Sequence, residues 1–145
     1  MKAMVDDVLC DLDLDPQDHC FDTEGGYPSW ALMRGSAQVF ILFHNPENKS
    51  PYPHLQIFSP LLCLPNSVES SAILCYQLLE LNASELSGGL AFGIRDKTVV
   101  LTASRSIQDL DASEFRSMLL LVGYYADLYD DILADKFGVE RYGQP

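Results

Sequence analysis

The amino-acid sequence predicts an α+β domain in which helices flank two groups of β-strands. Short apolar runs of strand composition, bounded by turn residues, occur in residues 19–64 and 88–105. Segments whose apolar residues recur at helical spacing precede, separate and follow these runs. The predicted order is therefore α-β-β-β-α-β-β-α, with three or four strands in the first group.

The composition is that of one globular domain. The chain has 145 residues, of which 48% are hydrophobic and 21% are charged. A chain of this length builds one well-covered core more readily than two. We therefore expect a single domain over residues 1–137 and a flexible tail over residues 138–145.

The N-terminal segment predicts a short amphipathic helix. Met4, Val8 and Leu12 share one face of that helix. Pro16 ends it, because the residue before a proline disfavours the helical backbone conformation. A short strand is expected next, over residues 19–24, stopped by a pair of glycines.

The central part of the chain predicts a hairpin and then a loop. Residues 29–34 and 37–44 have strand character and are joined at Gly35 and Ser36, which are typical turn residues. The loop over residues 45–53 is rich in proline and polar residues.

A strand and a helix are expected after this loop. In the strand, residues 54–64, Pro60 requires an edge position, a bulge or an early end, because proline cannot donate to the ladder. Asn66 is the predicted N-cap of the helix, with Glu69 completing a capping box. Asn82 is the predicted C-cap.

The C-terminal half predicts a second hairpin, over residues 88–95 and 98–105, and the longest helix. Asp111 and Glu114 form a capping box at its start, and a sustained apolar stripe follows. The helix is expected to have about 26 residues, or roughly 39 Å. Gly123 in its interior indicates close packing there, because glycine costs about 1 kcal/mol relative to alanine.

Charge excludes two classes of partner. The formal net charge is −12, from 21 acidic and 9 basic residues. A nucleic-acid binder needs clustered Lys and Arg to displace counterions, and an anionic membrane surface repels an acidic chain. No segment has the length of a signal peptide core or a membrane span. The cytoplasm is therefore the expected location, with the widely spaced cysteines as reduced thiols: Cys10, Cys20, Cys63 and Cys75.

No motif of catalysis, metal binding or cofactor binding was found. His19, His44 and His54 lie in different segments without metal-ligand spacing, and the acidic run 11–15 lacks the Gly and Glu positions of a calcium loop. The sequence therefore predicts no catalytic residue, no metal and no cofactor. The alternative is a small enzyme or ligand sensor with a pocket near the proline-rich loop, where His44 and His54 flank residues 45–53.

Two neighbouring strands are apolar on both faces. Phe40 and Leu42 point one way and Val39, Ile41 and Phe43 the other. Helices can cover one face, while the second lies against another subunit, lies against a bound segment or is covered internally. These alternatives stay open at this point. The candidate partner-binding residues are Trp30, Leu32, Val39, Phe40, Ile41, Leu42 and Phe43.

A succession of weak motifs resembles the YbjN-like proteins, which are related to the type III secretion chaperones of the Tir/CesT type. The pattern consists of LLELN, a strand hairpin, and then a capped helix that carries ADLY; it spans residues 78–133. The first half of the chain matches only in the order of its elements.

This resemblance implies a strongly bent antiparallel sheet packed by helices. It also implies a small cytoplasmic protein, often a homodimer, that holds extended segments of other proteins without ATP. The leading hypothesis is therefore a non-catalytic protein- or peptide-binding module, chaperone-like or adaptor. A third hypothesis is a self-associating domain whose dimer interface occupies the second sheet face.

Overall fold

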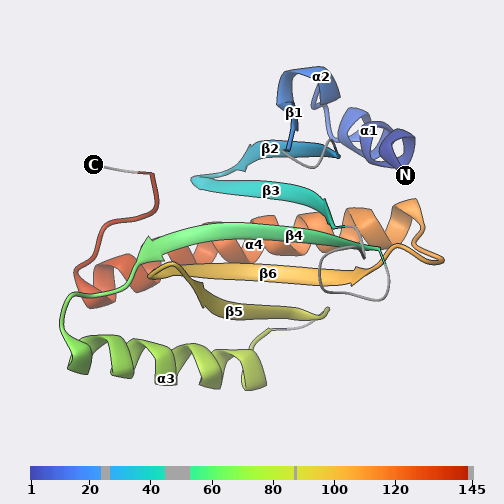
Figure 1. The fold of residues 1–145 in the computed structure, drawn as a ribbon. Coiled ribbons are helices and arrows are strands. Elements are labelled where there is room, and N and C mark those ends of the chain that lie inside the picture. The colour runs from blue at the N-terminus through green and yellow to red at the C-terminus, as the bar shows by residue number, and fades with distance from the viewer. Residues whose placement is uncertain (24–26, 45–52, 87, 144–145) are drawn as a thin grey trace.

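A six-stranded antiparallel sheet is the centre of the structure, a computed structural model that describes residues 1–23, 27–44, 53–86 and 88–143 (Figure 1). Its strand order is β1-β2-β3-β4-β6-β5. The strands are β1 (Cys20–Asp22), β2 (Pro28–Arg34), β3 (Ala37–His44), β4 (His54–Cys63), β5 (Leu90–Arg95) and β6 (Thr98–Ser106). The helices of this described part are α1 (Lys2–Asp11), α2 (Pro16–His19), α3 (Val68–Ser84) and α4 (Ala112–Phe137).

The predicted α+β fold and its element order are confirmed from β2 to α4, and the first group contains four strands. The short helix α2 was not predicted. The prediction that Pro16 ends the first helix was wrong, because α1 already ends at Asp11, with Leu12 as its C-cap. Pro16 instead begins α2, since its fixed φ and missing N–H suit the first helical position. The Asp15 side chain caps α2 by accepting a hydrogen bond from the Gln17 amide.

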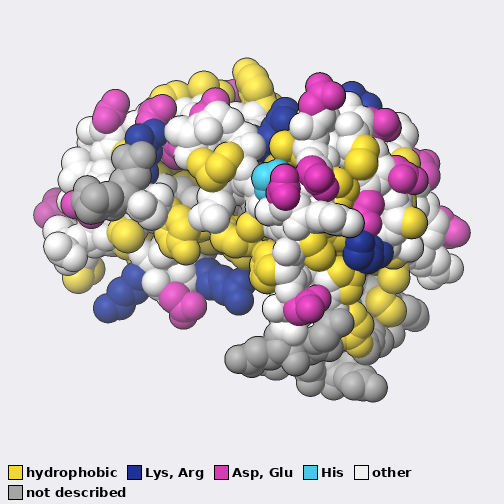
Figure 2. Space-filling model, turned by 90° about the horizontal axis from the view of Figure 1, so that it is seen from above, with side chains coloured by type: hydrophobic (Ala, Val, Ile, Leu, Met, Phe, Trp, Pro, Cys, Tyr) yellow, Lys and Arg dark blue, Asp and Glu magenta, His cyan; other side chains and the backbone are white. Residues whose placement is uncertain are grey.

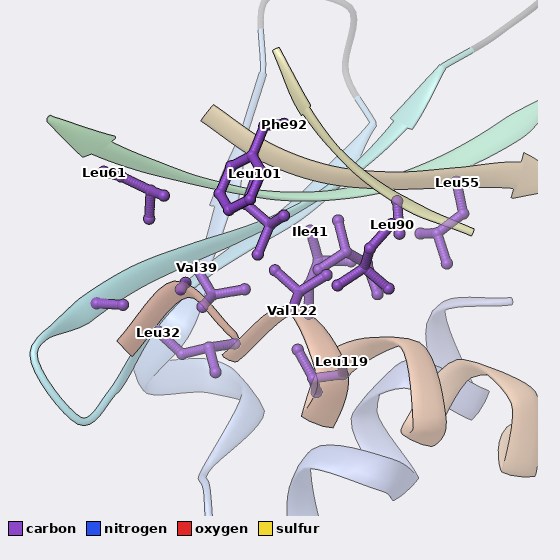
Figure 3. Close-up of a cluster of buried hydrophobic side chains, with 14 of the residues drawn as sticks. Leu32, Val39, Ile41, Leu55, Leu61, Leu90, Phe92, Leu101, Leu119 and Val122 are labelled. Atoms are coloured by element: carbon purple, nitrogen blue, oxygen red, sulfur yellow. The ribbon is translucent and has the colours of Figure 1, made fainter. Parts of the chain in front are cut away.

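The long helix α4 packs across one face of the curved sheet, along β3, β4 and β6 (Figure 1). One row of side chains under it crosses all six strands by direct pairing. The row contains Cys20, Trp30, Ile41, Ile57, Ala103 and Leu90. All but Cys20 are buried. Figure 3 shows Leu119 and Val122 of α4 directed at this side of the sheet.

The caps of α4 are as predicted, whereas those of α3 differ by one to three residues. Asp111 and Glu114 form the predicted capping box of α4. In α3 the N-cap is Ser67, whose hydroxyl accepts from the Ser70 amide, so the prediction of Asn66 was wrong. The predicted C-cap, Asn82, lies inside the helix because its side chain bonds to β5 instead.

Two further sequence features have a structural reason. The register of β4 against β6 shifts between Pro60 and Leu62, so the proline is accommodated by a bulge in a central strand. Gly123 is buried where α4 crosses β2, and a methyl group on it would lie 2.9 Å from Cγ of Arg34. The predicted close packing at Gly123 is therefore confirmed.

Some predictions lie outside the described residues. These are the glycine pair that was expected to stop the first strand and residues 45–52 of the proline-rich loop. In the described part, no helix combines the length and apolarity needed to cross a membrane. Residues 139–142 contact the end of β4 through backbone hydrogen bonds, and the flexibility expected of residues 138–145 stays a prediction.

The turn between β2 and β3 generates a first prediction. Gly35 has φ +59°, and a methyl group on it would overlap the side-chain carboxylate of Asp127. Gly138 has φ +62°, with nothing within 4 Å of the same position. Both Gly→Ala variants incur the left-handed backbone penalty, about 1 kcal/mol. Gly35→Ala is expected to lose at least a further 1 kcal/mol of unfolding free energy in urea denaturation, because its methyl group displaces a carboxylate. Equal losses in the two variants would contradict the close approach.

Candidate functional site

The face of the sheet opposite α4 carries a second row of side chains. Direct pairing aligns Ala31, Phe40, Phe58, Thr102 and Ala91 across five strands. Every member of this row is partly exposed, whereas the adjacent row under α4 is buried from Trp30 to Leu90. Since neighbouring residues of a strand point to opposite faces, the sheet has one covered and one open face. We call the second surface the open face; it also includes Leu42, Pro60 and Val100.

Two aromatic rings form the centre of the open face. Phe40 and Phe58 stack with ring centroids 5.1 Å apart, and Cζ of Arg95 lies 5.8 Å from the Phe58 centroid. The rings border a shallow hollow of about 360 Å³, whose wall also includes Leu42, Pro60, Val100, Thr98, Asp96 and Tyr142. Figure 2 shows apolar side chains gathered along a hollowed band, with basic side chains near one end. Such a surface is suited to apolar and aromatic side chains.

The structure divides the predicted partner-binding residues between the two faces. Trp30, Leu32, Val39 and Ile41 are at most 2% exposed and belong to the core under α4. Phe43 is half-buried and packs edge-to-face on Trp30, with 5.9 Å between the ring centroids. Phe40 and Leu42 alone of the seven lie on the open face.

Sequence reasoning missed Phe58, Pro60 and Arg95. The signal for Phe58 was present, because Gln56 and Phe58 alternate along β4 with the buried residues Leu55 and Ile57. Pro60 gave no such signal, since it is itself buried between buried neighbours. Arg95 depended on the curvature of the second hairpin, which brings it over a ring of another strand. No local pattern contains that information.

A group of hydrogen bonds fixes the β2–β3 hairpin, and with it Phe40, against α4. The Asp127 carboxylate accepts hydrogen bonds from the Ser36 amide at 2.8 Å and from its hydroxyl at 2.9 Å. The Ser36 hydroxyl also lies 2.7 Å from Oδ2 of Asp130. Because a hydroxyl has one proton, both contacts are hydrogen bonds only when Asp130 is protonated and donates.

The two carboxyls are shifted in opposite directions. The hydrogen bond from the Ser36 amide, followed by that from its hydroxyl, lowers the pKa of Asp127. Burial raises the pKa of Asp130, against the opposing effect of the Ser36 hydrogen bond. The side chain of Asp130 is almost completely buried, whereas Asp127 is exposed.

The helix α3 presents a second apolar surface, beside the edge strand β5. Leu74 and Leu78 are buried toward the sheet. The outward side is lined by exposed apolar side chains, Val68, Ile73, Tyr76 and Leu79, which we call the α3 ridge. Asn82 bonds to both backbone groups of Phe92 in β5, at 2.7 and 3.2 Å. These bonds occupy part of the free edge of β5.

The histidines of the alternative hypothesis do come together. His44 and His54 are paired across β3 and β4, and their rings stack with centroids 4.7 Å apart. The hydrogen-bond partner of the His44 ring is the side-chain amide of Gln56, at 2.9 Å, which in turn donates to Thr102. Among the described residues no group of His, Cys, Asp and Glu is placed to hold a metal ion. The two rings pack against each other, and the Gln56 amide holds the His44 ring in place.

Comparison with known families agrees with this geometry. A family profile described as "T3SS (YopN, CesT) and YbjN peptide-binding chaperone 1" matches residues 1–145. The chain belongs to this family. The predicted relationship to YbjN-like proteins and secretion chaperones is thereby confirmed, as is the prediction of a protein- or peptide-binding chaperone. No curated protein gave a significant match.

Solved structures show the same fold at low sequence identity. In the ExsC–ExsE complex the matched chain has 16% identity and a TM-score of 0.63, covering 91% of this chain and 92% of that one. In the structure of the Yersinia pestis type III secretion chaperone SycH with a fragment of YscM2, the matched chain has 19% identity and a TM-score of 0.56. This match covers 86% of this chain and 95% of that one. In the HopA1–SchA chaperone–effector complex, the matched chain has 13% identity and a TM-score of 0.60, and the match covers 90% of this chain and 92% of that one. These similarities confirm the predicted chaperone-like fold.

The two motifs on which the family resemblance was based connect the helices α3 and α4 to the strands of the sheet. In the LLELN motif Leu78 enters the core and Asn82 holds β5. In the ADLY motif Asp127 holds the β2–β3 hairpin, and Tyr129 packs edge-to-face on Phe92 at 5.4 Å. The motifs therefore position the strands of the open face without being part of it.

The pKa shifts predict opposite effects of two Asp→Asn substitutions. A lowered pKa gives Asp127 a stabilising effect that is present above the unfolded value and lost as pH falls through the folded one. The raised pKa gives Asp130 a stabilising effect below its unfolded value that is lost as pH rises. At pH 7, Asp127→Asn is expected to cost about 1 kcal/mol or less, given its exposure.

Asp130→Asn is expected to be neutral or stabilising at pH 7, and its difference from the natural chain should shrink as pH falls. Urea denaturation of both variants between pH 4 and 8 measures this. A loss of stability in Asp130→Asn that grows with pH would show that the buried carboxylate is favourable when ionised.

Proposed function

We propose that the chain binds an extended segment of another protein on the open face, as a non-catalytic chaperone or adaptor. The observation that carries this proposal is the half-exposed row from Ala31 to Ala91, with the stacked rings of Phe40 and Phe58 at its centre. An apolar surface of this kind loses free energy when another apolar surface covers it, about 25 cal/mol per Å². Membership of a peptide-binding family supports the same assignment.

An extended segment fits this surface better than a helix-sized or small-molecule ligand. The hollow beside Phe58 is shallow and borders the four strands from β3 to β5 rather than forming an enclosed cavity. Aromatic faces and the Arg95 guanidinium offer contacts to many side chains without a fixed hydrogen-bond pattern. Binding on this basis needs no cofactor or nucleotide, so we propose that it proceeds without ATP.

The proposed cellular compartment rests on the four cysteines, which form no disulfide in the structure. Cys10 and Cys63 are exposed, Cys20 and Cys75 are half-buried, and all four are free thiols. Unpaired thiols in this number suit a reducing compartment, and we propose the cytoplasm.

Peptide selection followed by substitution tests the open face. Random 15-residue peptides displayed on phage are selected on the natural chain, and their affinities are measured by fluorescence anisotropy. Phe58→Asp is expected to weaken binding at least tenfold, because it places a charge among apolar contacts. The matched control is Tyr124→Asp, which alters a tyrosine of α4 that is 64% exposed and outside the open face. Unchanged affinity in a folded Phe58→Asp variant would place the site elsewhere.

We further propose a homodimer that forms through the α3 ridge. Val68, Ile73, Tyr76 and Leu79 leave a contiguous apolar strip exposed along one helix. A helix can pack antiparallel against its own copy about a two-fold axis, so that each strip covers the other. This arrangement leaves the open face of both copies available for a segment.

Sedimentation velocity tests the dimer with a matched pair of tyrosines. Tyr76→Asp, at 69% exposure, is expected to yield a monomer, whereas Tyr124→Asp, at 64%, should sediment like the natural chain. A natural chain that remains monomeric at 100 µM would rule the dimer out. A dimer that survives Tyr76→Asp and dissociates in Phe58→Asp would move the interface to the open face.

A further inference from the structure

The segment after α4 folds back onto the sheet and pairs with the end of β4 through an isolated antiparallel bridge between Leu62 and Arg141. Gly138 ends the helix in the left-handed conformation, with φ 62° and ψ 36°, and reverses the chain. The Tyr142 amide then donates to the Leu61 carbonyl at 2.8 Å, and the Cys63 amide donates to the Glu140 carbonyl at 3.4 Å. Residues 139–143, which we call the strap, are thus antiparallel to the end of β4.

The strap lies beside the part of β4 that does not pair with β3. The pairing of β3 with β4 spans Phe40 to His44, whereas the pairing of β6 with β4 continues to Cys63. Beyond the bulge at Pro60, one edge of β4 therefore presents backbone groups that β3 does not reach. An unpaired edge of this kind is a template for an added strand, and the strap uses it.

The strap also reaches the open face. The side chain of Tyr142 forms part of the wall of the hollow that contains Phe40, Leu42, Phe58 and Pro60. The backbone pairing with Leu61 fixes its position there. A residue of the chain itself thus occupies one end of the surface on which a partner segment is expected to bind.

Val139 packs against the core, whereas several of the contacts that hold residues 140–142 are weak enough to be exchanged. One of the two backbone bonds is long, at 3.4 Å. The Tyr142 side chain remains 44% exposed. The ion pair of Arg141 with Asp131 of α4, at 2.6 Å, joins a side chain that is 26% exposed to one that is 59% exposed, and such a partly exposed pair contributes about 1 kcal/mol or less.

We propose that the strap is an intramolecular occupant of the open face, which an extended partner segment displaces. The partner pairs with the edge at Leu61 and Cys63 and places an aromatic side chain where Tyr142 lies. This inference rests on the proposed function and specifies both its partner and its regulation. The preferred segment is a β-strand with an aromatic residue, because the chain presents that combination to its own site.

Competition from the strap lowers the apparent affinity for a partner. If the site is open in about one molecule in ten, the apparent dissociation constant is about ten times the intrinsic one. Substitutions that release the strap are therefore expected to tighten binding, which is the opposite of the usual effect of removing an apolar side chain near a site.

A graded series at one position tests this in the full chain. Tyr142→Phe keeps the ring and the amide, Tyr142→Ser removes the ring, and Tyr142→Pro removes the ring and also the N–H that bonds to Leu61. The probes are the phage-selected peptides whose binding depends on Phe58. Relative to the natural chain, affinity is expected to be unchanged in the Phe variant, about threefold tighter in the Ser variant and about tenfold tighter in the Pro variant.

The control and the outcomes separate the two proposals. Tyr124→Ser, on α4, should leave the affinity unchanged. A synthetic peptide of residues 138–145 at millimolar concentration should compete with the probes on the Tyr142→Pro variant. Equal or weaker binding in the Ser and Pro variants, with Phe58-dependent binding intact, would overturn the strap and leave the proposed function standing. Failure to select any Phe58-dependent peptide on the natural chain and on Tyr142→Pro alike would overturn both.

Discussion

The packing of one long helix against one face of the sheet determines the rest of this structure. Helix α4 has 26 residues, or roughly 39 Å, and β4 beneath it has ten, or roughly 33 Å. The helix therefore spans the full length of the central strands but only one of their faces. Since the strands are apolar on both faces, the second face is left with half-exposed aromatic side chains. The open face is therefore a consequence of how the core is built.

Hydrogen bonds between the helices and the hairpins then hold the open face in shape. Asp127 binds the turn of the β2–β3 hairpin through Ser36, 91 residues away, and Asn82 binds the backbone of Phe92. Both are polar contacts to backbone groups that would otherwise be unpaired at a turn or an edge. The hairpins that carry Phe40 and Arg95 are thereby fixed to rigid helices, which preorganises the open face and reduces the entropy lost on binding.

The sequence allowed the fold to be predicted where the signals were local. The capping box at Asp111 and the hairpin at Gly35 depend on residues within a few positions of each other. The faces of β3 could not be assigned, because Val39 and Ile41 are as apolar as Phe40 and Leu42 and only the position of α4 distinguishes them. Asn82 was misjudged for the same reason: a good C-cap residue was used for a contact with another strand.

The open face also combines two requirements that conflict in most proteins. An apolar surface broad enough to hold a segment is a site for aggregation, and the net charge of −12 counters self-association only over the molecule as a whole. A chain segment that pairs with the exposed edge and places Tyr142 beside Phe58 covers part of that surface locally. Backbone pairing binds any sequence that can extend, while the aromatic rings favour some segments over others. On the strap proposal, a releasable internal segment protects the site and raises the affinity that a partner needs in order to bind.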